Sequence, residues 1–306
     1  MLQRTETKPS RNNICAVVIT YHPDIKLRER IEQIRHQVDK LLIIDNNSES
    51  ECIDMIQGIS KDLDVDVILN ESNLGVAEAL NQGFKYAKRF GGRYSWVLTL
   101  DQDTSCYPSL VEQLIMAYEA CPFRSEVGII GTNYQEKTTG RILHQKTQEE
   151  ENWEEVQNLP TSGCIVSLGV FSEVGDFRRD LFIDYVDTEY CMRLRDKGYR
   201  VLISLKIGMI HPLGYYRVSK LHQWIRGSSM ITNYPPIRHY YWTRNGLTLI
   251  FENFRRDISW SLNQAYYLFC RRIITVLLFE DKKIIKIGNI ALGVWHAVLS
   301  RGGTKK

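Results

Sequence analysis

The sequence predicts an α/β protein built on a mostly parallel sheet with helices on both faces. Residues 14–20 (ICAVVIT) form a nearly continuous apolar run, which is typical of a strand buried on both faces. Strand-like and helix-like segments alternate through the first half of the chain, as in βαβ units. Of 306 residues, 43% are hydrophobic and 25% are charged. This composition suits a globular protein with one such domain and an appendage.

The spacing of apolar residues defines the elements in order. Leu27, Ile31, Ile34 and Val38 recur at helical spacing. The acidic segment 148–155 carries five Glu and is expected to be a mobile loop. The predicted strands are 14–20, 41–44 (ending at Asp45), 65–69, 96–100, 127–131 and 164–168. Three helices are predicted, one that begins after Pro23, one at 75–90 that ends before Gly91-Gly92, and one around 109–120.

The C-terminal region differs from the rest of the chain in pattern and charge. From about residue 258 the pattern predicts long helices, and an apolar stripe at helical spacing includes Ile284, Ile287 and Val294. Residues 251–306 hold ten Lys or Arg against four Asp or Glu, a net +6, within a total of +3. A basic amphipathic region can lie on an anionic membrane. Packing on the preceding domain is the alternative.

Several classes of protein are disfavoured. There is no Gly-x-Gly-x-x-Gly after the first strand and no Gly-x-x-x-x-Gly-Lys-Ser/Thr, so ordinary dinucleotide and P-loop sites are not expected. Seven cysteines without a Cys-x-x-Cys pair favour reduced thiols in a cytoplasmic protein. Residues 1–13 are polar and are expected to form a loose tail. No uncharged apolar run reaches the ~18 residues that a membrane span needs.

An acidic triplet follows the strand expected at 96–100. Asp101 and Asp103, separated by Gln102, would both lie at the carboxyl edge of the sheet, where α/β proteins bind ligands. Two carboxylates there suit Mg²⁺ or Mn²⁺, with waters and phosphate oxygens as further ligands. The triplet therefore predicts a metal–diphosphate site, and a polar turn or helix cap is the alternative.

Two polar clusters end or begin neighbouring elements. The segment Asp45–Ser48 ends a strand and can hydrogen-bond a base or ribose, although an Asx-type turn explains it equally. Asn73, Leu74 and Gly75 open a predicted helix, whose N-terminus would favour a diphosphate. Capping by Asn73 is the alternative role.

Three acids gather near another predicted helix start. Asp184 can cap that helix, but capping does not account for both Asp187 and Glu189. A carboxylate there can act as a general base toward an acceptor hydroxyl. His211 follows the apolar stretch 203–210 and can be a third protein ligand to the metal, although a lone histidine is usually structural.

These segments together resemble a known family. In order they are TYHPD, IDNNS, NLGVAEALNQG, LTLDQDT, SGCIVSLGVF, FIDYVDTEYCMRLRDKGYRV and HPLG. They are similar to the inverting GT-A glycosyltransferases of family 2, most of all to the bacterial rhamnosyltransferase branch. The resemblance covers about residues 14–250, and the forms DQD and FIDYVDTE point to that branch.

The resemblance implies a role for each candidate residue. Val186 departs from the family pattern, because many members have Glu directly before the base. In this chain that acid is either missing or supplied by Asp184 or Glu189. The implied roles are donor binding for Thr20, Tyr21, Asp45, Asn73, Gly75, Asp101 and Gln102, metal binding for Asp103 and His211, general base catalysis for Asp187, and contact with the sugar or acceptor for Ser162, Gly163, Asp184, Glu189 and Arg244.

The resemblance also implies a reaction and a domain plan. The expected donor is dTDP-L-rhamnose, and the expected acceptor is a lipid-diphosphate-linked glycan of O-antigen, capsule or wall polysaccharide, at the cytoplasmic face of the membrane. The plan is a tail at 1–13, a GT-A domain at 14–250 and a membrane-associated helical region at 251–306. No nucleic-acid partner is expected. The alternative donors are UDP-galactose, UDP-glucose and UDP-galactofuranose. The alternative classes of protein are a nucleotidyltransferase and a non-catalytic scaffold.

Overall fold

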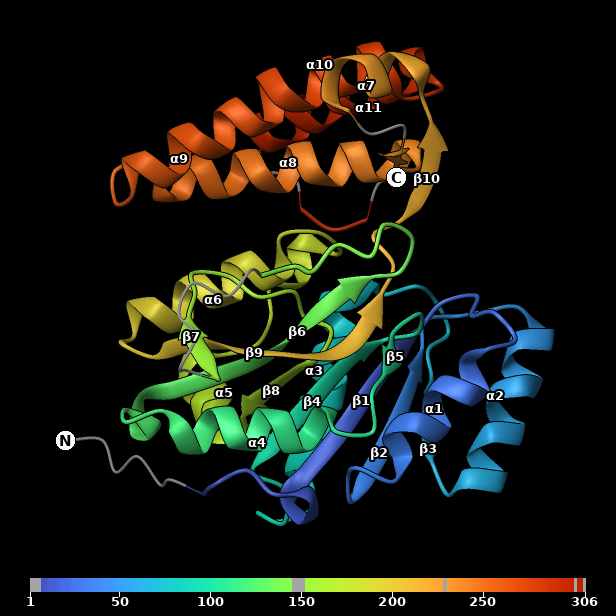
Figure 1. The fold of residues 1–306 in the computed structure, drawn as a ribbon, viewed down its shortest axis with the longest axis vertical. Coiled ribbons are helices and arrows are strands. Elements are labelled where there is room, and N and C mark those ends of the chain that lie inside the picture. The colour runs from blue at the N-terminus through green and yellow to red at the C-terminus, as the bar shows by residue number, and fades with distance from the viewer. Residues whose placement is uncertain (1–6, 145–151, 228–229, 300–301, 305–306) are drawn as a thin grey trace. The chain divides into compact units, whose positions relative to one another are not determined.

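The structure is a computed structural model, and it describes residues 7–144, 152–227, 230–299 and 302–304 (Figure 1). The chain forms two compact units. The N-terminal unit comprises Met1–Arg178 and Val186–Pro212, and the C-terminal unit comprises Arg179–Tyr185 and Leu213–Lys306. The division therefore falls earlier than the boundary predicted after residue 250.

The N-terminal unit contains the expected alternation of strands and helices. Its elements are β1 (Ile14–Thr20), α1 (Leu27–Arg35), β2 (Lys40–Asp45), α2 (Ser50–Leu63), β3 (Asp66–Leu69), α3 (Gly75–Lys88), β4 (Trp96–Asp101), β5 (Ser105–Cys106), α4 (Leu110–Ala120), β6 (Val127–Glu136), β7 (Trp153–Glu155), β8 (Cys164–Ser167), α5 (Leu168–Val174), α6 (Val186–Asp196) and β9 (Arg200–His211), with single 3₁₀ turns at Arg11–Asn13 and Arg124–Glu126.

One sheet joins these strands in the order β3-β2-β1-β4-β8-β6-β9-β5, with β7 paired to β9. The four strands from β3 to β4 are parallel. The strand β8 runs antiparallel to both β4 and β6, whereas β9 is again parallel to β6. The predicted α/β class is confirmed, and the reversed strand β8 is the main feature that the sequence did not predict.

Helices cover both faces of this sheet, as predicted. On one face, Ile14, Ala16 and Val18 of β1 join a core that includes buried residues of α1, α2 and α4. On the other face, α3 approaches β1 closely, because a Cβ on Gly83 would lie only 2.6 Å from Val17 Cγ1. A larger residue at position 83 would force the helix away from the strand.

The predicted elements agree with the structure at most positions. The strand at 14–20 has the predicted bounds, and the others start within about one residue of their predicted positions. The segment 153–155 forms β7 and so is not part of a mobile loop, since its backbone pairs with β9. Residues 148–151 of that predicted loop lie outside the described residues. The helix α2 was not predicted.

The C-terminal unit is a helical assembly with a small hairpin. Its elements are a 3₁₀ turn at Arg179–Leu181, β10 (Tyr215–Val218), α7 (Lys220–Arg226), β11 (Met230–Asn233), α8 (Pro236–Asn253), α9 (Ile258–Ala265), a π-helical segment at Tyr266–Arg272, α10 (Ile273–Phe279) and α11 (Lys283–Val298). The strands β10 and β11 are antiparallel. Among the described residues, none of the helices combines the length and apolar character that a membrane crossing requires.

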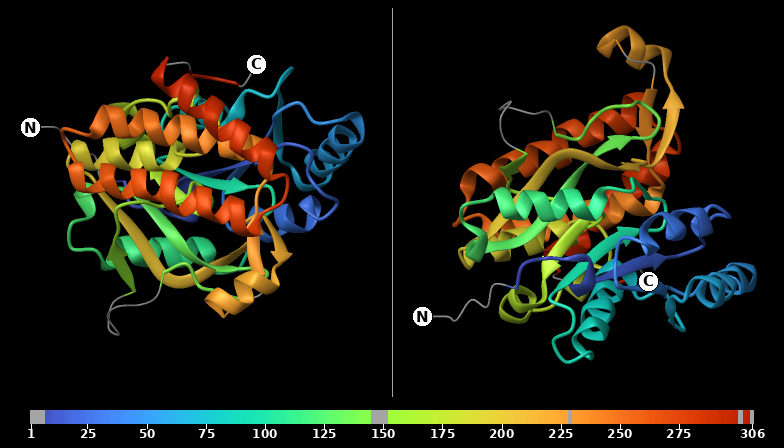
Figure 2. Two further views of the ribbon diagram at one scale, coloured as in Figure 1. Left: turned by 90° about the horizontal axis from the view of Figure 1, so that it is seen from above. Right: turned by 60° about the horizontal axis from the view of Figure 1, so that its bottom comes forward.

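The long helices α8 and α11 lie side by side in this unit (Figure 2). Their backbones approach closely at Gly293, where a Cβ would lie 2.7 Å from the carbonyl oxygen of Tyr240. The amide of Asn245 donates to the carbonyl oxygens of Leu181 and Ile183, at 2.9 and 2.8 Å. These contacts explain why α8 belongs to the C-terminal unit and why residues 179–185 join it.

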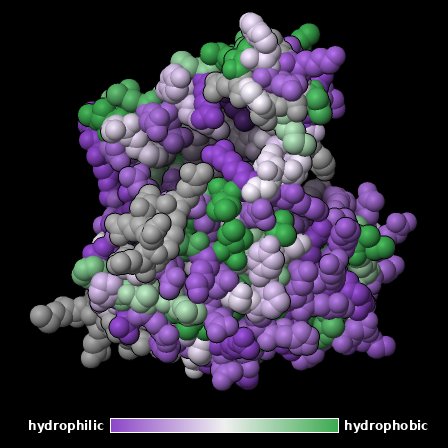
Figure 3. All heavy atoms as spheres, viewed as in Figure 1, coloured by the Kyte–Doolittle hydropathy of each residue, from purple (hydrophilic) through white to green (hydrophobic). Residues whose placement is uncertain are grey.

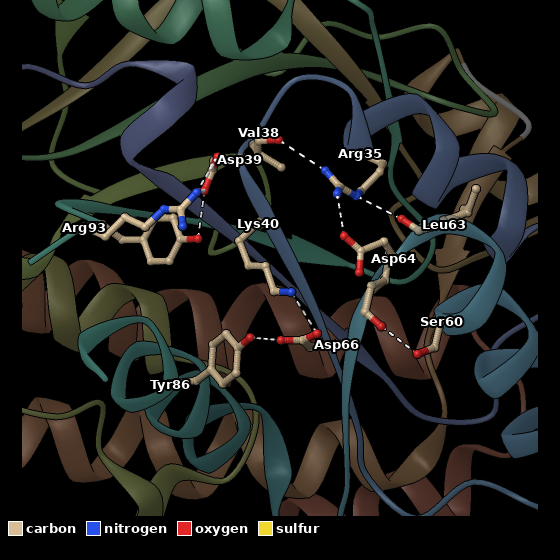
Figure 4. A network of polar contacts seen from close by, with 12 residues as sticks. Arg35, Val38, Asp39, Lys40, Ser60, Leu63, Asp64, Asp66, Tyr86 and Arg93 are labelled. Carbon is tan, nitrogen blue, oxygen red and sulfur yellow. Dashed lines mark hydrogen bonds and ion pairs between the residues drawn. The ribbon is translucent and has the colours of Figure 1, made fainter. Parts of the chain in front are cut away.

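A network of polar contacts joins elements of the N-terminal unit at the end of the sheet where β2 and β3 begin (Figure 4). Lys40 Nζ lies 2.8 Å from Asp66 Oδ1, and Tyr86 of α3 donates to the other oxygen. Arg35 Nε donates to the carbonyl of Leu63 at 3.0 Å, which joins α1 to α2. The helices are thereby tied to the strands on the side opposite the strands' carboxyl ends.

We expect Asp66→Asn to lower the free energy of unfolding by about 0.5–1 kcal/mol at neutral pH, the range for a partly exposed ion pair. Burial alone would raise the pKa of Asp66, but hydrogen bonds from Lys40 and Tyr86 outweigh it and lower the pKa. The wild type's advantage should be complete above the ordinary value of 3.8 and decline as the pH falls below it. Urea unfolding at several pH values measures this, with the exposed Asp54→Asn as control. An equal loss of unfolding free energy in Asp66→Asn at every pH would contradict a role for the charge of Asp66.

Candidate functional site

The carboxyl ends of the central parallel strands bring separate motifs to one edge of the sheet. Thr20 at the end of β1 pairs with Asp45 at the end of β2. Ile19 pairs with Asp101 at the end of β4. Parallel register therefore aligns three segments that lie far apart in the sequence. This is the edge at which α/β sheets bind ligands.

Asp101, Asp103 and His211 form a cluster at this edge, with their candidate ligand atoms all within 4.8 Å of one another. His211 Nδ1 lies 3.6 Å from Asp103 Oδ1, and His211 Nε2 lies 3.9 Å from Asp101 Oδ2. The imidazole is only 12% exposed, whereas the two carboxylates are 40% and 45% exposed. A mostly enclosed histidine thus supports two acids that solvent and ligands can reach.

A chain of hydrogen bonds fixes this cluster from behind. Thr104 Oγ1 lies 2.9 Å from His211 Nδ1 and 2.7 Å from Ser162 Oγ. Ser162 Oγ accepts from the backbone N–H of Asp101 at 3.0 Å. The ring of Tyr134 meets the imidazole edge-on, with centroids 5.5 Å apart. Because Nδ1 is engaged by Thr104, Nε2 is left to face a ligand.

The cluster fits a divalent cation. Asp103 Oδ1 is buried and has no hydrogen-bond partner within the described part of the chain. Leaving such an oxygen without a partner is costly, so a bound cation is a natural one. Two carboxylates and an imidazole form a mixed O/N set of the kind that Mn²⁺ or Mg²⁺ accepts beside phosphate oxygens.

The segments expected to bind the nucleotide assemble beside the cluster. Asp45 is fully buried, and its oxygens accept from the hydroxyls of Thr20 and Ser48 at 2.8 and 2.6 Å. Tyr21 is 46% exposed, and both its backbone N–H and its carbonyl bond the amide of Gln102, at 2.7 and 3.1 Å. The side chains of Asp45 and Gln102 therefore shape the backbone of this region, and Tyr21 is the side chain that is open to a ligand.

The start of α3 is tied to the end of β2. Asn46 Nδ2 donates to the carbonyl oxygen of Gly75 at 3.3 Å, and Asn70 Nδ2 donates to Asn46 Oδ1 at 2.9 Å. Asn73 Oδ1 accepts from the N–H of Gly75 at 3.0 Å, although the N-cap residue of α3 is Leu74, which has no side-chain cap bond. The segments 45–48 and 73–75 thus meet at the same edge of the sheet.

Asp187 lies in the first turn of α6, where its Oδ1 accepts from the N–H of Thr188 at 2.7 Å. Burial raises the pKa of the Cys164 thiol well above its usual value, and the charges of Asp187 and Asp101 add to this shift. Asp101 lies near the start of β8, because its backbone N–H donates to Ser162 Oγ at 3.0 Å. Gly163 directly precedes this strand, and its N–H bonds the carbonyl of Thr99 at 2.8 Å.

Three other candidates take structural roles. Arg238 forms a bidentate ion pair with Asp184, in which the bond from Nε is 2.8 Å long. Both residues belong to the C-terminal unit. Glu189 is held in the same way by Arg193, at 2.7 and 2.9 Å. Arg244, expected near the sugar or acceptor, makes its contacts within the fold. Its guanidinium is buried and donates to the carbonyl oxygens of residues 180, 181 and 303.

Sequence reasoning missed two residues that support the site. Thr104 connects His211 to Ser162, and its position right after the acidic triplet was the available signal. Arg30 is mostly buried, pairs with Asp24 and donates to the carbonyl oxygen of Gln102 at 3.0 Å. An arginine on a helical stripe gives no sign of that distant contact.

Comparison with known proteins identifies the class. Residues 15–175 match the family model of glycosyl transferase family 2. Over 256 residues the chain is 30% identical to the dTDP-rhamnosyl transferase RfbF of Shigella flexneri, which covers 79% of this chain and 81% of that protein. The chain therefore belongs to glycosyl transferase family 2, and its resemblance to the rhamnosyltransferase branch is confirmed.

Solved structures of glycosyltransferases share the fold. TarS 1–349 of S. aureus superposes with a TM-score of 0.58 at 13% identity, covering 94% of this chain and 82% of that one. GalNAc-T7, solved with UDP, GalNAc and Mn²⁺, gives a TM-score of 0.54 at 13% identity, covering 95% of this chain and 55% of that one. The predicted GT-A fold is thereby confirmed.

We expect Thr104→Val to weaken binding of Mn²⁺ by about 10–100-fold, because it removes the hydroxyl that orients a ligating histidine. Thr104→Ser keeps the hydroxyl and should bind nearly as the wild type does. Calorimetric titration with Mn²⁺ in the presence of a nucleoside diphosphate measures the difference. Equal affinities of the two variants would show that the contact with His211 does not support the metal.

Proposed function

We propose that this glycosyltransferase transfers L-rhamnose from dTDP-L-rhamnose to a hydroxyl of a lipid-diphosphate-linked glycan, with a divalent cation and with inversion of configuration. The observation that carries the proposal is the cluster of Asp101, Asp103 and His211 at the carboxyl edge of the sheet. The name of the Shigella relative supports the donor. The glycan would belong to O-antigen, capsule or wall polysaccharide.

The residues fit a single displacement. Asp187 takes the proton of the acceptor hydroxyl as that oxygen bonds to the anomeric carbon, and the bond from this carbon to the diphosphate oxygen breaks. The electron pair of the broken bond leaves with dTDP, so a β-linked donor gives an α-linked product. A cation held by Asp103 and His211 would offset the negative charge that develops on the diphosphate.

We expect Asp187→Asn to reduce turnover by about 10²–10⁴-fold, the usual contribution of a general base. Donor binding should change little, because the amide keeps the size of the side chain. Release of dTDP under saturating donor measures turnover, and calorimetry measures binding. The exposed Asp54→Asn on α2 is the matched control. Turnover like that of the wild type in Asp187→Asn would exclude this residue as the base.

A panel of nucleotide sugars tests the donor. The protein is incubated with Mn²⁺ or Mg²⁺, with and without a lipid extract as acceptor source, and free nucleoside diphosphate is assayed. We expect metal-dependent release from dTDP-L-rhamnose. Release from UDP-galactose, UDP-glucose or UDP-galactofuranose would favour the second candidate, a UDP-sugar donor. That candidate has some support, because TarS with UDP superposes at a TM-score of 0.52. A nucleotidyltransferase would leave Asp187 without a role.

We also propose that the C-terminal unit contacts the inner face of the cell membrane. Figure 3 shows hydrophobic residues among hydrophilic ones on this unit. Leu262 and Tyr266 are 57% and 62% exposed, one turn apart on adjoining helical segments. Basic residues of the same region would favour anionic lipids. Further exposed apolar side chains of this unit include Trp224, Ile258, Ile274, Leu277, Trp295 and Val298.

We expect the double variant Leu262→Ser, Tyr266→Ser to bind anionic vesicles at least about tenfold more weakly, because both apolar side chains would otherwise leave water. Sedimentation with phosphatidylglycerol vesicles measures this. Asn263→Ser changes an exposed polar residue on the same helix and serves as control. Equal binding of the two variants would argue against contact through this face.

A further inference from the structure

A cavity of about 870 Å³ lies within the C-terminal unit. Two segments form it, one from the β10–α7 connection at residues 217–220 and one from the α10–α11 connection at residues 278–285. Its size is within the range of small-molecule sites. No part of the proposed transfer reaction uses it. The question is which ligand its chemistry would accept.

Four exposed cations line the cavity, namely Arg217, Lys220, Lys282 and Lys283. Its two acids are engaged by a buried lysine, since Lys286 Nζ lies 2.7 Å from Glu280 Oε2 and 3.0 Å from Asp281 Oδ1. The lining alone carries two more positive than negative charges, and Lys286 also offsets its acids from inside. The cavity therefore presents a positive surface to solvent.

A second contact reinforces this arrangement. His239 Nε2 lies 3.1 Å from Glu280 Oε2, and neither side chain is exposed to solvent. Glu280 is thus directed toward His239 and Lys286 in the interior. It is not available to neutralise Lys220 or Lys283 at the surface.

The start of α11 is electrostatically unusual. A helix N-terminus carries a partial positive charge and favours acidic side chains. Here the residue before the helix is Lys282, the first residue is Lys283, and the first turn contains no acid. Lys282 has no side-chain hydrogen bond that caps the helix. Helix stability does not account for these charges, whereas an anion in the cavity would relieve their repulsion.

The rim of the same cavity is apolar and open. Ile284 is 89% exposed and Val218 is 69% exposed, and Leu278 and Ile285 also line the cavity with exposed side chains. A small inorganic anion would leave these side chains in water. A ligand with a phosphate and hydrocarbon chains would use both the cations and the rim.

We propose that this cavity binds the phosphate of a membrane lipid, with the cations around the phosphate and the acyl or prenyl chains against the apolar rim. The inference rests on the proposed membrane contact and names the lipid chemistry that the contact recognises. Phosphatidylglycerol and polyprenyl phosphate both present this chemistry, and the experiment separates them.

The test compares two double variants of the full chain. Lys220→Gln with Lys283→Gln removes two charges from the cavity lining. Arg255→Gln with Arg271→Gln removes two exposed charges outside it. Both variants lose the same general attraction to an anionic surface. Binding is measured by sedimentation with phosphatidylcholine vesicles containing either phosphatidylglycerol or polyprenyl phosphate, and thermal unfolding checks that each variant is folded.

We expect the cavity variant to bind phosphate-bearing vesicles at least about tenfold more weakly than the control variant, because charge-assisted hydrogen bonds are lost as well. A difference confined to one lipid identifies that lipid as the ligand. Equal losses in the two variants would overturn the proposal, as would the same affinity for inorganic phosphate as for lipid phosphate.

Failure of the membrane contact can be told apart from failure of the cavity. A short-chain prenyl phosphate and a short-chain phosphatidylglycerol, each below its micelle-forming concentration, are titrated in solution by calorimetry, where no membrane is present. Binding of either probe to the wild type that is lost in the cavity variant, together with no vesicle binding, would retain the cavity and reject the membrane face. No binding of either probe to the wild type would reject the cavity.

Discussion

The parallel register of β1 with its two neighbours determines where the candidate site lies. Thr20, Asp45 and Asp101 reach one edge only because β2 and β4 run in the same direction as β1, with their ends level. Short polar side chains at this edge are engaged in buried hydrogen bonds. Asp45 accepts from the hydroxyl of Ser48, and the amide of Asn46 donates to the carbonyl oxygen of Gly75. Asp103 differs, since its Oδ1 is buried without a hydrogen-bond partner among the described residues, and it marks the point where a ligand completes the structure.

The parts of the fold that were predictable are those in which local pattern and buried environment agree. The run at 14–20 is apolar up to Thr20 because β1 is buried along its whole length. The four-residue strand β8 was located, but its reversed direction depends on pairing with β4 and β6, which a short apolar run does not encode. The helix α2 was missed although Ile56, Ile59 and Leu63 recur at helical spacing and pack on the core, so its pattern was available in the sequence.

The candidate site likewise has residues whose position was predictable and residues whose position was not. The metal cluster was predictable because acids that end a strand and a histidine that ends another converge at a sheet edge. Arg244 was not, because its partners are backbone carbonyls at residues 180, 181 and 303, far from it in sequence. The resemblance implied contact with the sugar or acceptor, yet Arg244 is buried in α8 and bonds the backbone. Residue type alone does not distinguish the two uses of arginine.

The buried charges of the C-terminal unit are harder to explain by stability. Lys286 and Glu280 have fully buried side chains, and taking such charges out of water offsets much of their attraction. An apolar core would serve packing as well. Burying Glu280 against Lys286, however, withdraws an acid from the cavity and leaves Lys220 and Lys283 unneutralised beside it. The arrangement is therefore better understood as maintaining a positive surface for an anionic ligand than as a source of stability.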